Sequence, residues 1–285
     1  MRFESPTTTR EAVALLTRER GDAYVLAGGT DLLVRMKLDL IEPDLVVDIK
    51  GIAAMQSIRT TASGTRIGAA VSCAELGENK KLKKTWPGVV EAANLIGSDQ
   101  IQGRCTMVGN LCNASPAADS VPALMAAAAK VVIVGKKKRR TVAIEKIITG
   151  PGETSLARGE VIEAIILPRR PPKSGDAYLR FIPRTEMDIA VVSAGISLKL
   201  ERGVIKSARV ALGAVAATPL LVPAAARAIV GSKLDDAALE KLAAACSNAC
   251  KPIDDKRGTI EYRTRVVGVL ARRAAKIAYQ RAGGA

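Results

Sequence analysis

The stretch AGGTDLL, residues 27–33, stands between an apolar run and a segment with helical spacing. The residues AYVLA (23–27) are predicted to form a buried strand, and DLLVRMKL (31–38) a short helix. A second buried strand is predicted at LVVDI (45–49). This order of strand, glycine turn, helix and strand is typical of a small α/β unit, in which backbone N–H groups at the helix start can hold a phosphate. An ordinary turn without a ligand has the same pattern.

A second polar stretch, TMVGNLCNASPAADSVPAL (106–124), is predicted to be a long loop that leads into an apolar helix. Long polar loops inside compact domains tend to be functional. Thr106, Asn110 and Asp119 supply a hydroxyl, an amide and a carboxylate, which suit sugar hydroxyls and phosphates. The alternative is structural, because Asn113 and Asp119 also suit turns and helix caps.

The rest of the chain predicts a mixed α and β protein of about two domains. A capping box at Thr8 and Glu11 precedes a helix that runs to Gly21, and the linker candidate is ILPRRPPKSG (166–175). The expected hairpins pair 56–60 with 65–69, 131–135 with 141–144, and 191–200 with 204–213. The other expected helices are 88–96, 222–230, 235–249 and 259–281. The domain boundary is placed near residue 172.

The composition excludes several kinds of site. The 285 residues contain no histidine, which removes Ser-His-Asp hydrolysis, Cys-His nucleophiles and metal sites that need imidazole. A net charge of +15 suits a solvated surface, an acidic partner or a phosphate, while 2% aromatic residues disfavour binding of single-stranded nucleic acid. The five cysteines match no disulfide or iron–sulfur spacing. The chain shows no signal peptide and no membrane span, so a cytoplasmic protein is expected.

The stretches at 27–33 and 106–124, taken in this order, resemble the flavin-binding medium subunit of the molybdenum hydroxylases. This family includes the medium subunits of carbon monoxide dehydrogenase and bacterial xanthine dehydrogenase. The resemblance runs over nearly the whole chain and extends to EAANLI (91–96), GEVIEAIILP (159–168), DIAVVSAGISL (188–198) and YRTRVVGVLARRA (262–274).

The resemblance implies an α+β fold. Its first part is a PCMH-type, vanillyl-alcohol-oxidase-like FAD-binding domain at 1–172, with subdomains at about 1–54 and 55–172. A C-terminal flavoprotein domain with an antiparallel sheet and helices follows at 173–285.

The resemblance also implies FAD-binding residues, and it implies no catalytic or metal-binding residue. The expected pyrophosphate loop consists of Val25, Leu26, Ala27, Gly28, Gly29, Thr30, Asp31 and Leu32, which act largely through backbone N–H groups. The second expected phosphate-facing loop consists of Thr106, Met107, Val108, Gly109 and Asn110. Asp119 is expected to bind hydroxyl groups of the cofactor. The residues expected to line the cofactor are Ile96, Ile162 and Arg180. Relatives usually have two glycines where this chain has Val108-Gly109, and a lysine is common at Arg180.

By resemblance, the chain is an electron-transfer subunit of a molybdenum hydroxylase. Its FAD takes electrons from a small iron–sulfur subunit, while a large molybdopterin subunit oxidises the substrate; the expected assembly is a dimer of heterotrimers. The electrons then pass to NAD, oxygen or a quinone, and NAD would bind only transiently because no GxGxxG motif occurs.

Two other functions are compatible with parts of the sequence. A free-standing FAD-dependent oxidase would act on a small substrate directly, but it needs a base near the flavin for which no residue stands out. A nucleic-acid-binding module would explain the +15 charge and the KKKRR run (136–140), but it lacks a recognisable motif. The electron-transfer subunit is therefore the preferred function.

Overall fold

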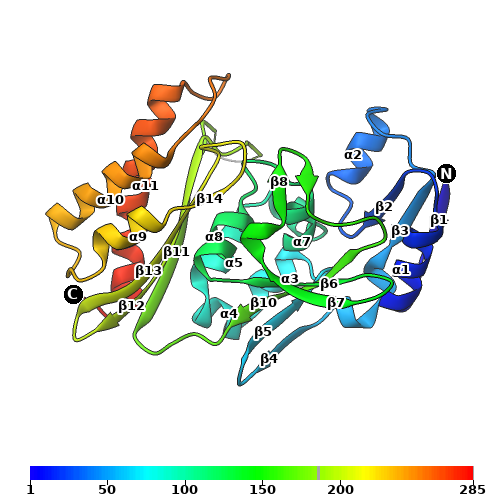
Figure 1. Ribbon diagram of the computed structural model, residues 1–285, viewed down its shortest axis with the longest axis horizontal. Coiled ribbons are helices and arrows are strands. Elements are labelled where there is room, and N and C mark those ends of the chain that lie inside the picture. The colour runs from blue at the N-terminus through cyan, green and yellow to red at the C-terminus, as the bar shows by residue number, and fades with distance from the viewer. Residues whose placement is uncertain (185–186, 285) are drawn as a thin grey trace.

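The computed structural model describes residues 1–184 and 187–284. Figure 1 shows three layers of structure along the long axis: an N-terminal α/β unit, a central part, and a C-terminal sheet with its helices. None of the helices in the described residues has both the length and the apolar character needed to cross a bilayer.

The N-terminal unit is a parallel sheet of three short strands, β1 (Arg2–Glu4), β2 (Ala23–Leu26) and β3 (Leu45–Asp48), in the order β1-β3-β2. Helix α1 (Thr9–Arg18) lies between the first two strands, and helix α2 (Leu32–Lys37) between the next two. Helix α1 begins with the predicted capping box of Thr8 and Glu11. The two predicted strands and the helix between them are confirmed, and they place the AGGTDLL turn at the carboxyl end of β2.

The central part is an antiparallel five-stranded sheet in the order β4-β5-β10-β6-β7. Its strands are β4 (Ile58–Thr61), β5 (Gly64–Gly68), β6 (Lys130–Val134), β7 (Arg139–Ala143) and β10 (Val161–Pro168). The helices of this part are α3 (Cys73–Glu78), α4 (Lys80–Thr85), α5 (Pro87–Ala93), α6 (Asp99–Gln102), α7 (Met107–Cys112) and α8 (Ser120–Ala126). The short pair β8 (Ile148–Gly150) and β9 (Glu153–Thr154) forms a separate ribbon. Three 3-10 turns complete it: η1 (Ile49–Gly51), η2 (Ala53–Met55) and η3 (Ile144–Lys146).

The stretch predicted as a continuous polar loop contains a helix, so that prediction was wrong for α7. The Thr106 side chain caps this helix by accepting a hydrogen bond from the Gly109 N–H at 2.9 Å. Val108 and Leu111 are buried in the core, and this burial offsets the weak helix propensity of the glycine and asparagine beside them.

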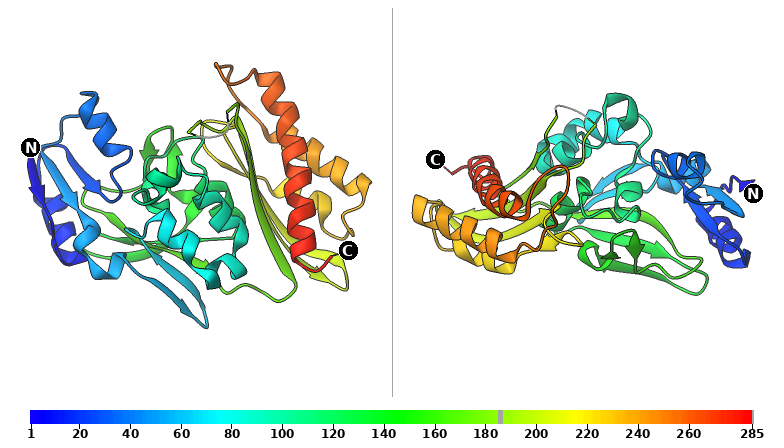
Figure 2. Two further views of the ribbon diagram at one scale, coloured as in Figure 1. Left: turned by 180° about the vertical axis from the view of Figure 1, so that it is seen from behind. Right: turned by 90° about the horizontal axis from the view of Figure 1, so that it is seen from above.

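The C-terminal part is an antiparallel sheet of four strands in sequence order: β11 (Ser174–Phe181), β12 (Val192–Glu201), β13 (Val204–Gly213) and β14 (Leu220–Leu221). Helices α9 (Pro223–Ile229), α10 (Asp236–Ala249) and α11 (Ile260–Arg281) cover its outer face (Figure 2). Helices α5 and α8 of the central part pack on its inner face. This sheet therefore forms one wall of the junction between the two halves.

The described residues form two large hydrophobic cores, one on each side of this junction. Two arginines join the halves: Arg170 pairs with Asp176, and Arg281 pairs with Glu91. The boundary placed near residue 172 stays a prediction; it lies in the segment between β10 and β11.

Candidate functional site

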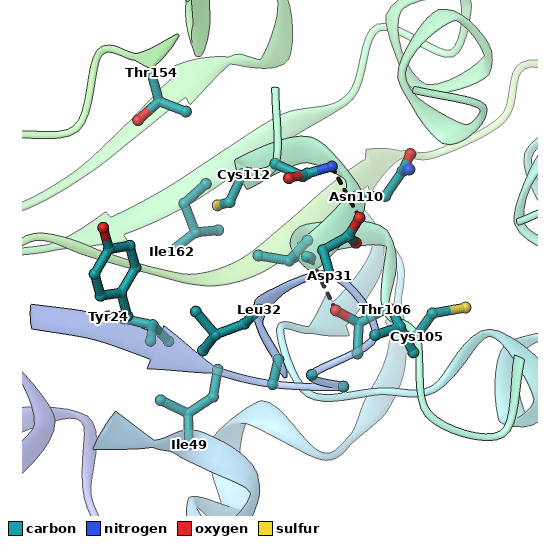
Figure 3. Close-up of a pocket in the computed structure, with 18 of the residues that line it drawn as sticks. Tyr24, Asp31, Leu32, Ile49, Cys105, Thr106, Asn110, Cys112, Thr154 and Ile162 are labelled. Atoms are coloured by element: carbon teal, nitrogen blue, oxygen red, sulfur yellow. Dashed lines mark hydrogen bonds between the residues drawn. The ribbon is translucent and has the colours of Figure 1, made fainter. Parts of the chain in front are cut away.

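A cavity of about 450 Å³ lies where the two stretches singled out in the sequence meet. Its walls come from β2, the turn into α2, the segment that leads into α7, the start of β10 and the β8–β9 ribbon. In Figure 3, Asp31, Thr106 and Asn110 lie toward one end of the cavity, and Tyr24 and Thr154 toward the other. Its size is within the range of small-molecule and cofactor sites.

The turn at Gly28-Gly29 is shaped by backbone packing. A side chain at Gly28 would place its Cβ 2.1 Å from the carbonyl oxygen of Arg104, so the two segments lie too close for any other residue. Gly29 has φ +81°, in the region that favours glycine. Among the described residues, the N–H groups from Gly28 to Leu32 donate to no protein oxygen. They remain available to a ligand at the start of α2.

The segment into α7 forms the facing wall of the cavity. Asn113 donates from Nδ2 to Asp31 Oδ1 at 3.0 Å, which links this helix to the Gly28-Gly29 turn. The Asn110 Oδ1 accepts hydrogen bonds from the Ser120 N–H at 3.1 Å and from Ser120 Oγ at 2.7 Å. Asn110 thereby holds the beginning of α8 in place, and its Nδ2 remains for a ligand.

The structure brings most of the expected FAD-binding residues together. Those that line the cavity are Val25, Ala27, Gly28, Gly29, Thr30, Asp31, Leu32, Ile96, Thr106, Val108, Gly109, Asn110 and Ile162. Leu26 and Met107 are buried in the protein beside it. Asp119 and Arg180 do not line the cavity but pair with each other at the junction of the two halves.

Asp119 belongs to a buried polar cluster at this junction. Its Oδ2 accepts a hydrogen bond from Arg180 Nη1 at 2.8 Å, and its Oδ1 accepts one from the Tyr178 hydroxyl at 3.1 Å. Burial raises the pKa of Asp119 to about 6, although Arg180 and Tyr178 both oppose this shift. Within the described residues, Arg180 Nε is buried without a hydrogen-bond partner, so this donor is available to a further acceptor.

Several residues that line the cavity were missed by the sequence analysis. Tyr24 lies on β2 one residue before the expected loop, and Gly152, Thr154 and Leu156 come from the segment around the β8–β9 ribbon. The sequence signal for this segment was the run TGPGETSL (149–156), in which two glycines flank a proline. Its nearness to β2 depends on tertiary structure and is not visible in the sequence.

Residues 1–170 match the model of the FAD binding domain in molybdopterin dehydrogenase, and residues 177–278 match that of the CO dehydrogenase flavoprotein C-terminal domain. The chain belongs to the family of FAD-binding medium subunits of molybdopterin dehydrogenases. It is 35% identical to the carbon monoxide dehydrogenase medium chain of Afipia carboxidovorans over 281 residues, which are 98% of this chain and 97% of that one. It is 28% identical to the xanthine dehydrogenase FAD-binding subunit of Escherichia coli O157:H7, over 99% and 97% of the two chains.

The same likeness is seen in solved structures. A chain of the reconstituted CO dehydrogenase from Oligotropha carboxidovorans aligns with a TM-score of 0.94 at 34% identity, over 99% of this chain and 98% of that one. A chain of quinoline 2-oxidoreductase from Pseudomonas putida 86 aligns with a TM-score of 0.91 at 25% identity, over the same shares. The family and the α+β fold predicted from the sequence are confirmed.

FAD is the cofactor of this family of flavoproteins, and the cavity in this chain fits it. The closely packed Gly28 turn and the free N–H groups that follow it form a cradle for a pyrophosphate. Val108, in the second expected phosphate-facing loop, lines the cavity with a side chain that is largely buried in the core.

Proposed function

We propose that this chain is the electron-transfer subunit of a cytoplasmic molybdenum-containing dehydrogenase. In this proposal a small iron–sulfur subunit delivers electrons, a large molybdopterin subunit oxidises the substrate, and the electrons leave this chain for NAD, oxygen or a quinone. The observation that supports it is the full-length match to proteins that are themselves named as a medium chain or an FAD-binding subunit. The proposed assembly is a dimer of heterotrimers.

The proposed binding residues are the seventeen expected from the sequence. The backbone from Val25 to Leu32 holds the pyrophosphate, and Thr106 to Asn110 supports it from the facing wall. Ile96 and Ile162 supply apolar contacts. Asp119 and Arg180 act on the cofactor from the junction, and Arg180 Nε has no hydrogen-bond partner among the described residues.

Bound FAD supplies the redox chemistry, and this chain's residues set its position and surroundings. The free N–H groups at the start of α2 offset the negative charge of the pyrophosphate. The hydrogen bond between Asn113 and Asp31 links the two walls of the cavity.

A visible absorbance spectrum tests whether this chain binds FAD. It is taken on the purified chain after incubation with FAD and removal of the free ligand. Retained flavin bands are expected. Stopped-flow mixing of the co-expressed three-subunit complex with its substrate then tests electron delivery, and bleaching of the flavin band is the expected result.

The competing function predicts a different outcome. If the isolated chain turns over a small reducing substrate without any partner, the free-standing oxidase is the correct description. If the intact complex oxidises its substrate while its flavin band stays unchanged, the electron-transfer role is wrong. Native mass spectrometry of the complex checks the stoichiometry.

A further inference from the structure

Tyr24 lines the cofactor cavity but is not among the seventeen proposed FAD-binding residues. It lies on β2, and its ring is at the end of the cavity away from Asp31 and Thr106 (Figure 3). Among the described residues that line this cavity, Tyr24 is the one aromatic residue. Aromatic residues make up only 2% of the chain, so a ring in this wall is an unusual feature.

The wall between Tyr24 and Asp31 carries apolar side chains. Leu32, Ile49 and Ile162 all line the cavity and lie on the Tyr24 side of Asp31 (Figure 3). A phosphate placed among them would lose water and gain no hydrogen bond from these side chains. A flat, uncharged ring system would instead bury apolar surface against them and against the Tyr24 ring. This end of the cavity therefore suits a ring of the cofactor and not its phosphates.

FAD has two ring systems, and the proposed site decides which of them lies at the Tyr24 end. The pyrophosphate joins the flavin half of the cofactor to its adenosine half, so the halves extend in different directions from the phosphate site. Asn110 accepts hydrogen bonds from Ser120, the residue that follows Asp119, so the Asn110 end of the cavity leads toward the junction. Asp119 offers a partner there for the ribityl hydroxyls, and Arg180 offers a cation for the redox-active ring. The adenosine half is therefore left for the Tyr24 end.

We propose that Tyr24 is a further FAD-binding residue, whose ring packs against the adenine base and makes this chain select FAD over FMN. FMN lacks the adenosine half of the cofactor, so it cannot make this contact. Contacts between a base and an aromatic side chain use the faces of the two rings and are favourable for any base. The inference rests on the proposed function, because it takes the phosphate site and the role of Arg180 from it.

A role of Tyr24 in the sheet alone can be separated from a role in binding. Phe3 on β1 and Tyr24 on β2 pair in register with the same residue, Val46 on β3, from its two sides. Phe3 does not line the cavity. Phe3→Ala therefore removes a ring from the same row of the same sheet, and it is the matched control for Tyr24→Ala.

The test compares the binding of FAD, ADP and FMN to the purified chain after its flavin has been removed. ADP carries the adenine and the pyrophosphate without the flavin, while FMN carries the flavin and one phosphate without the adenine. The variants are Tyr24→Ala, Tyr24→Phe and Phe3→Ala. The melting temperature of each variant is measured first to show that it is folded, and the dissociation constants are then measured by titration calorimetry.

Tyr24→Ala is expected to bind FAD and ADP about tenfold more weakly than wild type, because it loses the contact between the base and the ring. Its affinity for FMN is expected to stay within about twofold of wild type. Tyr24→Phe keeps the ring and Phe3→Ala lies outside the cavity, so both are expected to bind all three ligands within about twofold of wild type.

The proposal is overturned if Tyr24→Ala binds FAD and ADP normally, or if it weakens FMN as much as FAD. It is also overturned if Tyr24→Phe loses as much affinity as Tyr24→Ala, or if Phe3→Ala shows the same loss. Each of these results leaves the proposed function standing. A flavin band that stays unchanged when the intact complex oxidises its substrate would refute the electron-transfer role and leave the contact between Tyr24 and the adenine standing.

Discussion

The shape of the cofactor cavity depends on the close packing of Gly28 against Arg104. Replacing it with alanine would bring a Cβ to 2.1 Å from the Arg104 carbonyl oxygen, so one wall of the cavity must move. We expect Gly28→Ala to weaken FAD binding by at least about tenfold, equivalent to roughly 1.4 kcal/mol, in a fluorescence titration of the apoprotein.

Gly103→Ala is the matched control for this prediction. Its Cβ would meet no atom nearer than the Gln100 carbonyl oxygen at 3.7 Å, which is an ordinary contact. FAD binding within about twofold of wild type is expected for this variant. Equal effects of the two substitutions would show that the close approach at Gly28 does not shape the site.

Asp119 gives the protein a stability that depends on pH. Its pKa of about 6 in the folded chain lies above the ordinary value of 3.8, because burial disfavours the charged form. Its contribution to stability is therefore fully present below pH 3.8 and is lost as the pH rises through about 6. Urea unfolding of wild type and Asp119→Asn at several pH values measures this effect.

The difference in unfolding free energy, wild type minus variant, should fall by on the order of 2 kcal/mol between about pH 4 and pH 7. The other carboxyl groups contribute equally to the stability of both proteins, so their contributions cancel in this difference. A difference that is flat across the range would mean that Asp119 titrates at the same pH in the folded and unfolded chains.

At the scale of elements, Glu163 on β10 ties together parts that are distant in sequence. Its carboxylate accepts hydrogen bonds from Thr9 Oγ1 on α1 and Arg66 Nη2 on β5, each at 2.9 Å, and pairs with Arg139 on β7. We expect Glu163→Gln to lower the free energy of unfolding by about 3 kcal/mol, because it leaves charged partners around a neutral group. Chemical denaturation measures the loss.

The control is Glu201→Gln on β12. Glu201 pairs with Lys206 at 3.5 Å, and both side chains are more than half exposed. We expect Glu201→Gln to change the free energy of unfolding by at most about 0.5 kcal/mol. If Glu163→Gln costs no more than this surface pair, the cluster does not hold the elements together.

The elements that the sequence predicted correctly are those whose side-chain pattern is local. Strands β2 and β3 are short apolar runs, and α10 and α11 have apolar residues at helical spacing. Helix α7 was missed because its glycine and asparagine favour a loop, while the burial of Leu111 that stabilises it depends on the rest of the fold.

The candidate site was predictable in its two loops but not in their surroundings. Asp119 was expected on the cofactor, and its pairing with Arg180, 61 residues later, could not be read from the sequence. Tyr24 and Thr154 were missed for a similar reason: the β8–β9 ribbon comes near β2 only when the chain has folded.

At the scale of the whole molecule, the stability of the fold depends on the junction between its two halves. Arg170 donates to the Ser174 carbonyl at 3.0 and 3.2 Å, lies 4.8 Å from the centre of the Trp86 ring, and pairs with Asp176. The side chain of Asp176 is only 5% exposed. The pair is therefore held in a setting that solvent reaches poorly.

We expect Arg170→Gln to lower the free energy of unfolding by about 3 kcal/mol, since it leaves a buried carboxylate without its partner. Arg281→Gln breaks a pair that is about one-third exposed and should cost about 1 kcal/mol or less. Thermal and urea unfolding of both variants test the contrast. Equal losses would mean that burial of the Arg170 pair adds nothing to the junction.

The hydrogen bond from Asn113 to Asp31 has a consequence for which subunit shapes the cavity. It joins the two walls of the cavity with residues of this chain alone. This link between the two walls therefore needs no contact with another subunit.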